Sequence, residues 1–211
     1  MKHLLIIVLF LLYGILYGQD ESSYVKVTNT SELINKIKEM SEATKTIESD
    51  FTQEKHLSML EEVIISKGYF CYKKENNIRW EYIEPIKYLI IIHDGIFTIN
   101  DGIKIQKYDT KSNKIFKEIN DIIVNSVQGN ILNNPQFVIS YFENNNYFLA
   151  KLIPNKKEMS NFITCIEIYF DKNNFSVSKI KMIEPADDFT CITFTNKKLN
   201  EEVPDTKFFA N

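Results

Sequence analysis

The sequence is poor in the residues and motifs from which enzyme active sites are built. Only two histidines, His56 and His93, lie beyond the first few residues, and glycine occurs six times in 211 residues. No GxSxG, HExxH, CxxC or glycine-rich phosphate loop is present. The acidic pairs Glu61-Glu62 and Asp187-Asp188 are adjacent, so on a strand their carboxylates would point to opposite faces. These absences argue against an enzyme and give no reason to expect a cofactor.

Cysteine is scarce as well. The three cysteines, Cys71, Cys165 and Cys191, allow at most one disulfide and leave at least one thiol. Their neighbours are apolar, aromatic or threonine residues, which is typical of small buried hydrophobic side chains. None has the spacing of a metal ligand with His56 or His93. The sequence therefore predicts no metal site and leaves open whether a disulfide forms.

Long apolar runs are absent except at the N-terminus. Lys2 precedes an unbroken apolar run over residues 4–12, which continues to Tyr17 and ends in the polar residues 19–21. A basic start, an apolar run of about 7–15 residues and a small residue near its end are typical of a secretory signal peptide. The alternative, a membrane anchor, needs about 20 apolar residues. We expect cleavage near Gly18, which leaves residues 19–211 as a single domain.

The charge pattern also limits the partners. The formal net charge is −3, with no basic stripe for nucleic acid and no polybasic patch for anionic lipid. No cysteine directly follows the N-terminal apolar run, so the mature chain has no site for acylation as its first residue. We expect a protein that is free in an extracytoplasmic space and does not bind nucleic acid.

Helical spacing of apolar residues occurs in three segments. Residues 32–45 are expected to form an amphipathic helix that begins after Ser31 as its N-cap. A second helix is expected after Ser112 or Asn113 and extends to Val127. A third, shorter helix is expected over residues 133–141, with Pro135 in its first turn.

Most of the remaining chain has the period of two that is typical of strands. Turn signals occur at residues 74–77 and at Asp94-Gly95, a dipeptide suited to a type I′ hairpin. The pattern predicts a mostly β (α+β) fold, a strongly curved antiparallel sheet or partial barrel with helices over its open face. Strands are expected over residues 46–56, 63–74, 78–82, 88–93, 96–100, 103–108, 148–153, 162–170, 175–183 and 189–194.

The strands carry rows of large apolar side chains, such as Ile78, Trp80 and Tyr82 on one side of a single strand. Such rows form the core of an ordinary sandwich, or they line a cavity for an alkyl chain. In the second case burial contributes about 0.8 kcal/mol for each CH₂ group. Arg79, the only arginine in the chain, lies between two of these residues and should point away from them, toward Glu81 or an acid of a neighbouring strand.

Several segments together resemble the LolA family of periplasmic lipoprotein carriers. The agreement in order and spacing extends over most of residues 31–209, and its most specific part is the pair of segments at 68–74 and 78–82. The matching segments are DFTQ at 50–53, GYFCYKK at 68–74, IRWEY at 78–82 with Pro85, Asp94-Gly95, and VPD at 203–205 before Phe208.

The resemblance implies an unclosed β-barrel with helices as a lid over a hydrophobic cavity, in a monomeric periplasmic protein. The resemblance also implies that the helices expected after Ser31 and Asn113 lie on the lid side of the cavity. The expected partners are acylated lipoproteins, an inner-membrane lipoprotein-releasing ABC transporter as donor and an outer-membrane acceptor. The resemblance and the apolar rows together give the candidates for residues that line the acyl-chain cavity. These are Phe51, Phe70, Tyr72, Ile78, Trp80, Tyr82, Ile91, Ile166, Ile168, Phe170 and Met182.

The chain departs from the family pattern at one position, in the turn after residues 68–73. The sequence also leaves the function open between a carrier and a sensor. Family members often have Arg-Pro after the Gly-x-aromatic strand, and the arginine helps to latch the lid. Lys74 stands at the matching place and cannot make bidentate contacts, so it is the candidate latch here. The alternatives to a carrier of lipoproteins are a LolA-like sensor of lipid-modified proteins in envelope stress signalling, and a carrier of another lipid or a pigment precursor.

Overall fold

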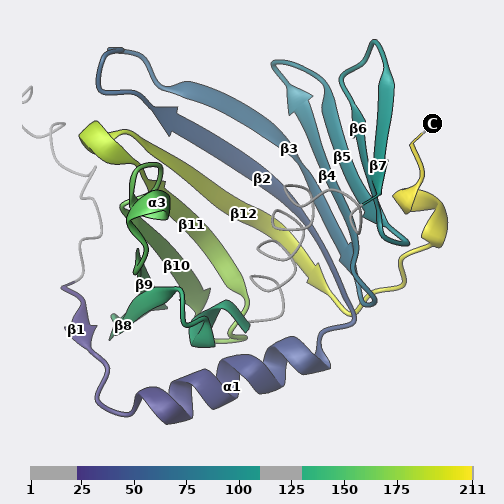
Figure 1. Cartoon of the computed structure of the whole chain (residues 1–211). Coiled ribbons are helices and arrows are strands. Elements are labelled where there is room, and N and C mark those ends of the chain that lie inside the picture. The colour runs from purple at the N-terminus through teal and green to yellow at the C-terminus, as the bar shows by residue number, and fades with distance from the viewer. Residues whose placement is uncertain (1–22, 110–129, 211) are drawn as a thin grey trace, which may run out of the picture.

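The described part of the chain is built around one large antiparallel sheet (Figure 1). The computed structural model describes residues 23–109 and 130–210. The expected signal peptide and the expected helix after Ser112 or Asn113 lie outside these residues. The sheet has twelve strands: β1 Val25–Lys26, β2 Thr46–His56, β3 Ile64–Lys73, β4 Asn77–Glu84, β5 Tyr88–His93, β6 Ile96–Asn100, β7 Ile105–Asp109, β8 Phe137–Glu143, β9 Tyr147–Pro154, β10 Cys165–Asp171, β11 Val177–Ile183 and β12 Phe189–Leu199.

The strand order is β1-β8-β9-β10-β11-β12-β2-β3-β4-β5-β6-β7. The edge strands β1 and β7 do not pair with each other, so the sheet curves without closing, as the sequence predicts. The 11-residue strands β2 and β12 pair in the middle and join the two halves of the arch. We call the face that carries Phe70 and Ile78 the inner face, and the face that carries Cys71 and Arg79 the outer face.

The helix α1 (Thr30–Ala43) packs against the inner face through Leu33 and Ile37. It begins one residue before the expected cap, so the expectation for Ser31 is wrong. Asn29 is the N-cap because its Oδ1 accepts the backbone N–H of Glu32 at 3.2 Å, while its Nδ2 donates to the Glu32 carboxylate at 3.1 Å. No helix among the described residues is long and apolar enough to cross a membrane.

The helix expected over residues 133–141 is wrong. A short 3₁₀ helix, η1 (Asn130–Asn133), precedes strand β8, which pairs with β9 along its whole length. Val138, Ile139 and the neighbouring aromatic residues have high strand propensity, and the ladder to β9 satisfies their backbone groups. The other short helices are α3 (Lys157–Ser160), η2 (Pro185–Asp187) and η3 (Asp205–Phe208).

The two hairpin turns lie where the turn signals in the sequence predict them. Asp94 and Gly95 have φ values of 49° and 74°, and Glu75 and Asn76 have φ values of 73° and 66°. Asp94-Gly95 is a two-residue loop between the paired residues His93 and Ile96, and positive φ at both positions is the type I′ geometry, which matches the right-handed twist of the flanking strands. The β3–β4 loop has three residues, 74–76, because Lys73 pairs with Asn77. The two turns fix the register of β3 with β4 and of β5 with β6.

Three apolar clusters stabilise the arch. One joins α1, η1 and strands β8–β10, and includes Leu33, Ile37 and Leu152. The second covers the inner face of the other half, around Phe51 and Ile78. The third lies on the outer face, where the C-terminal segment packs back onto the sheet; its buried members are Cys71, Ile91, Val203 and Phe208.

Candidate functional site: an apolar cavity on the inner face

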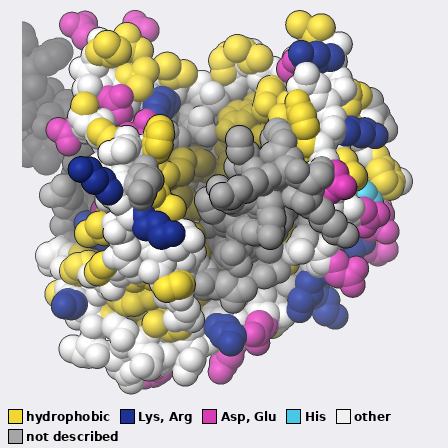
Figure 2. All heavy atoms as spheres, viewed as in Figure 1, with side chains coloured by type: hydrophobic (Ala, Val, Ile, Leu, Met, Phe, Trp, Pro, Cys, Tyr) yellow, Lys and Arg dark blue, Asp and Glu magenta, His cyan; other side chains and the backbone are white. Residues whose placement is uncertain are grey.

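A cavity of about 330 Å³ lies between α1, η1 and the inner face of the sheet. Figure 2 shows hydrophobic side chains in the hollow between the two halves of the arch. The volume is at the lower end of the range of about 300–1,000 Å³ that is usual for ligand pockets. Its lining is contributed by α1, by η1 and by strands of both halves, so residues that are far apart in the sequence meet there.

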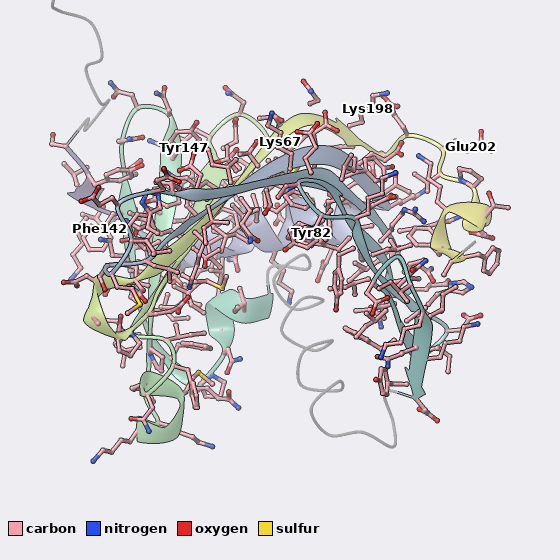
Figure 3. The ribbon with its side chains drawn as sticks, turned by 90° about the horizontal axis from the view of Figure 1, so that it is seen from above. Lys67, Tyr82, Phe142, Tyr147, Lys198 and Glu202 are labelled. Carbon is pink, nitrogen blue, oxygen red and sulfur yellow. The ribbon has the colours of Figure 1, made fainter. Side chains whose placement is uncertain are left out.

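Eight of the eleven cavity candidates line this cavity, on β3, β4, β10 and β11. Tyr82 is one of them, and Figure 3 shows it beneath the arch while Lys67 and Lys198 lie on the opposite side. The eight residues are Phe70, Ile78, Trp80, Tyr82, Ile166, Ile168, Phe170 and Met182.

The other three candidates lie elsewhere. Phe51 and Tyr72 are buried in the inner-face cluster and do not reach the cavity surface. Phe51 instead supports the wall, with its ring centroid 4.9 Å from that of Trp80 and 5.2 Å from that of Tyr82. Ile91 points to the outer face because it pairs with Arg79, and the cavity residue of that strand is its neighbour Ile90.

Several lining residues are absent from the candidate set. Ile37 and Met40 come from the apolar side of α1, whose helical spacing was the available signal. Ile180, Ile192 and Phe194 come from the apolar rows of β11 and β12. Ile47 and Ser49 share the parity of Phe51 on β2, so alternation along that strand was the available signal. Lys197 had no such signal, because its facing depends on an irregularity of β12 that is described below.

Lys74 contacts the helix that packs over the inner face. Its Nζ donates to the carbonyl of Glu42 at 2.7 Å, and its backbone N–H donates to the carbonyl of Lys45 at 2.8 Å. A cation at the last turn of a helix satisfies free carbonyl groups and interacts favourably with the helix dipole. Lys74 therefore joins the β3–β4 turn to the C-terminal end of α1.

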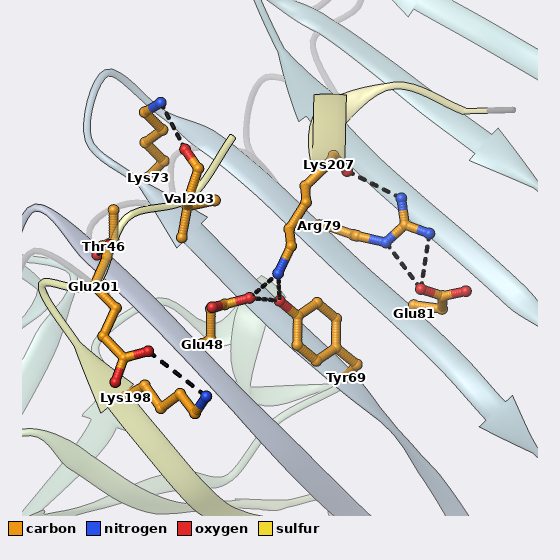
Figure 4. A network of polar contacts seen from close by, with 10 residues as sticks. All are labelled: Thr46, Glu48, Tyr69, Lys73, Arg79, Glu81, Lys198, Glu201, Val203 and Lys207. Carbon is orange, nitrogen blue, oxygen red and sulfur yellow. Dashed lines mark hydrogen bonds and ion pairs between the residues drawn. The ribbon is translucent and has the colours of Figure 1, made fainter. Parts of the chain in front are cut away.

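Arg79 points away from the cavity, as the alternation along its strand predicts. Its Nε and Nη2 both lie 2.8 Å from the Glu81 carboxylate, and its Nη1 donates to the carbonyl of Lys207 at 3.0 Å (Figure 4). The single arginine thus holds the C-terminal segment on the outer face and takes no part in the cavity. Its planar fork of donors allows it to bind both acceptors at once.

A polar network next to Arg79 fixes the same segment. The Lys207 ammonium and the Tyr69 hydroxyl both donate to the Glu48 carboxylate, and Lys73 Nζ donates to the carbonyl of Val203 at 2.9 Å (Figure 4). Burial alone would raise the pKa of Glu48, but the hydrogen bonds from Lys207 and Tyr69 outweigh it and hold the pKa below its ordinary value.

The described residues contain no disulfide among the cysteines and no cluster of three or more His, Cys, Asp or Glu side chains that could hold a metal ion. Cys71 is fully buried under the C-terminal segment, and burial raises the pKa of its thiol. Cys165 and Cys191 are half-buried and free. The cavity wall is mostly apolar, with a few polar side chains.

The family model of "Outer membrane lipoprotein carrier protein LolA" matches residues 42–210. The chain belongs to the LolA family. This confirms the resemblance in the strand segments from Asp50 to Phe208, and the family is one of carriers and binders. No protein with a curated description matches the sequence significantly.

Solved structures share the LolA-like fold at low sequence identity. MucB has a TM-score of 0.56 at 12% identity, over 88% of this chain and 64% of MucB. The Pseudomonas aeruginosa MucA/MucB complex has a TM-score of 0.53 at 10% identity, over 87% of this chain and 61% of the matched chain. An uncharacterised conserved protein from Thermus thermophilus has a TM-score of 0.50 at 9% identity, over 85% of this chain and 92% of that protein. The LolA-family chain spans less than two thirds of the length of MucB.

Proposed function

We propose that this LolA-family protein carries the acyl chains of lipoproteins in its inner-face cavity, from the inner membrane toward the outer membrane. The observation that carries the proposal is the apolar cavity itself, which is walled by aromatic and aliphatic side chains and covered in part by α1. An acyl chain in such a wall gains about 0.8 kcal/mol for each CH₂ group removed from water. No directional chemistry is needed, which fits the shortage of catalytic motifs.

The proposal assigns α1 the role of a lid. Ile37 and Met40 of α1 face the cavity, so an incoming acyl chain competes with their contacts to the sheet. Lys74 is the proposed latch, because its hydrogen bond to the Glu42 carbonyl holds the end of the helix at the β3–β4 turn. Lys74 makes one side-chain hydrogen bond there, where an arginine could make two, so we expect a weaker latch.

The proposal also includes the location and the partners. The carrier acts in the periplasm after residues 1–18 are removed near Gly18, receives cargo from an inner-membrane lipoprotein-releasing ABC transporter and delivers it to an outer-membrane acceptor. Retention of residues 1–18 as an anchor would contradict diffusion between two membranes. Mass spectrometry of the N-terminal peptide of the exported protein tests this part directly.

The function is tested by cargo capture with a matched pair of variants. Ile180 lines the cavity, whereas Thr193 is exposed on the outer face of the adjacent strand. The wild type and Thr193→Glu should co-purify with acylated proteins from the periplasm, and Ile180→Glu should lose most of them, because a carboxylate in the cavity wall disfavours an alkyl chain. Equal recovery by the two variants, or no acylated protein with the wild type, would contradict the proposal.

The likeness to MucB favours one second candidate, a sensor that binds a protein partner. One matched structure is a complex of MucB with MucA. Depletion of a carrier should stop the arrival of lipoproteins at the outer membrane. Depletion of a sensor should change only a stress response and leave lipoprotein arrival intact.

A further inference from the structure

One charged side chain lies in the otherwise apolar or neutral lining of the cavity among the described residues, that of Lys197. It is only partly exposed and comes from the end of β12. Burying part of an ammonium group in an apolar wall costs free energy, so such a group is usually paired or functional. The groups around the Lys197 ammonium therefore indicate which kind of ligand the cavity can bind.

A β-bulge turns Lys197 inward. Phe194 faces the cavity, so strict alternation would place Asn196 inward and Lys197 outward. The register between β12 and β2 instead shifts between Thr195 and Lys198, and Asn196 has a φ of 53°. Asn196 consequently faces outward, where its Nδ2 donates to the Asp50 carboxylate at 2.8 Å. Bulges commonly redirect a side chain next to a binding site.

The Lys197 ammonium is held by neutral oxygen atoms. It donates to Ser176 Oγ at 2.7 Å, to Ser178 Oγ at 2.9 Å and to the carbonyl of Val177 at 3.2 Å. No carboxylate of the described residues forms an ion pair with it within 4.0 Å. Burial lowers the pKa of the ammonium, and the more distant Asp171 acts in the opposite direction. The charge is thus oriented by its neighbours but not neutralised by them.

Ser49 supplies a second, independent observation. It lies on β2 between Glu48 and Asp50, the two partners that flank the bulge, and so stands opposite Lys197 in the ladder. Its side chain lines the cavity, only 3% of the residue is exposed, and its Oγ has no hydrogen-bond partner among the described residues. A buried hydroxyl without a partner is costly and is a donor available to a ligand.

We propose that Lys197 and Ser49 bind the anionic end of a single-chain amphiphile, a carboxylate or a phosphate, whose alkyl chain lies along the apolar wall. The inference rests on the proposed function, because it requires that the cavity accept alkyl chains. It adds a ligand class, since an acyl group in ester or amide linkage has no charge at its carbonyl. A free fatty acid or an alkyl phosphate has one, and a hydrogen bond between charged groups is stronger than one between neutral groups.

The test compares ligands that share a chain of twelve carbon atoms, counting the carboxyl carbon of the laurates, and that differ at its end: laurate, dodecyl phosphate and neutral methyl laurate. Affinities are measured for the purified chain by displacement of a fluorescent fatty-acid analogue. Lys197→Met keeps the stem and removes the charge, and should weaken laurate or dodecyl phosphate by about tenfold or more while methyl laurate changes less than about twofold. Lys198→Met is the matched control, because Lys198 faces outward beside it and should leave all affinities unchanged (Figure 3).

The arms of the experiment separate the outcomes. A loss confined to laurate identifies a carboxylate ligand, and a loss confined to dodecyl phosphate identifies a phosphate ligand. Equal losses for all three ligands, or none, overturn the inference while leaving the proposed function intact. If the wild type binds none of the three ligands, both the inference and the proposed function are contradicted. Should Lys197→Met not fold, Ser49→Ala replaces it, with an expected loss of about threefold for the anions only.

Discussion

Gly68 is the residue at which β3 has no room for a side chain. A Cβ atom there would lie 2.1 Å from the carbonyl oxygen of Glu81 and 2.4 Å from the ring of Phe51. The ring of Phe51 crosses the strand at this point and supports Trp80 and Tyr82 from below. Glycine in a strand often marks such a close approach.

Gly68→Ala should therefore lower the free energy of unfolding by about 1–3 kcal/mol, because the carbonyl and the ring must both move. Lys67→Ala, at the neighbouring exposed position, should change it by no more than about 0.5 kcal/mol. Urea denaturation followed by Trp80 fluorescence measures both. A Gly68→Ala protein as stable as the wild type would show that Phe51 does not need this space.

Glu48 makes stability depend on pH in the acid range. Its pKa in the folded protein lies below the ordinary value of 4.5, so its contribution is fully present above pH 4.5 and is lost as pH falls through the folded pKa. Glu48→Gln should reduce this acid-side fall in unfolding free energy, and Lys207→Met should reduce it too, because Lys207 donates to the carboxylate. Denaturation curves between about pH 3 and pH 6 test this, and identical slopes for all three proteins would contradict it.

At the level of elements, the contact between the β3–β4 turn and α1 decides how firmly the proposed lid is held. Lys74→Ala removes the hydrogen bond to the Glu42 carbonyl at the helix end, which is worth about 0.3–1 kcal/mol. Amide hydrogen exchange in the last turn of α1 should become roughly two- to fivefold faster. Lys36→Ala, on the exposed side of the same helix, is the control and should leave that turn unchanged, because Lys36 pairs with Glu32 in the first turn. Unaltered exchange in Lys74→Ala would remove Lys74 from the latch.

The elements also show where prediction from sequence succeeds. Strands β5 and β6 have the predicted bounds, because Asp94-Gly95 specifies both the turn and the register. Strand β8 was missed because a short apolar run around Ile139 fits a helix and a strand equally well, and only the ladder to β9 decides.

The site was predictable as far as alternation along a strand holds. Trp80 and Arg79 lie on the expected faces, and Ile91 does not, because its facing depends on pairing with β4. The inward position of Lys197 could not be predicted from the sequence, because the bulge at Asn196 reverses the alternation after Phe194. Irregularities of this kind depend on the partner strand and leave little signal in the sequence.

At the scale of the whole molecule, an open arch explains how a small domain maintains a cavity. Closing twelve strands would enclose the inner face in a barrel, whereas the sheet formed by the described residues ends at β1 and β7, which do not pair with each other. The long strands β2 and β12 join the two halves, and α1 packs across one of them. The outer face is reinforced by the C-terminal segment, which Arg79 and Lys207 hold in place.

The central claim is that the inner-face cavity takes acyl chains, and titration of the single tryptophan tests it most directly. Trp80 lines the cavity, so a palmitoylated cysteine peptide should shift its emission and saturate, while the same peptide without acyl chains should have no effect. Ile180→Glu should weaken the acylated peptide by about tenfold or more, and Thr193→Glu should match the wild type. An unchanged Trp80 spectrum at saturating acylated peptide, or equal binding of both peptides, would contradict the account.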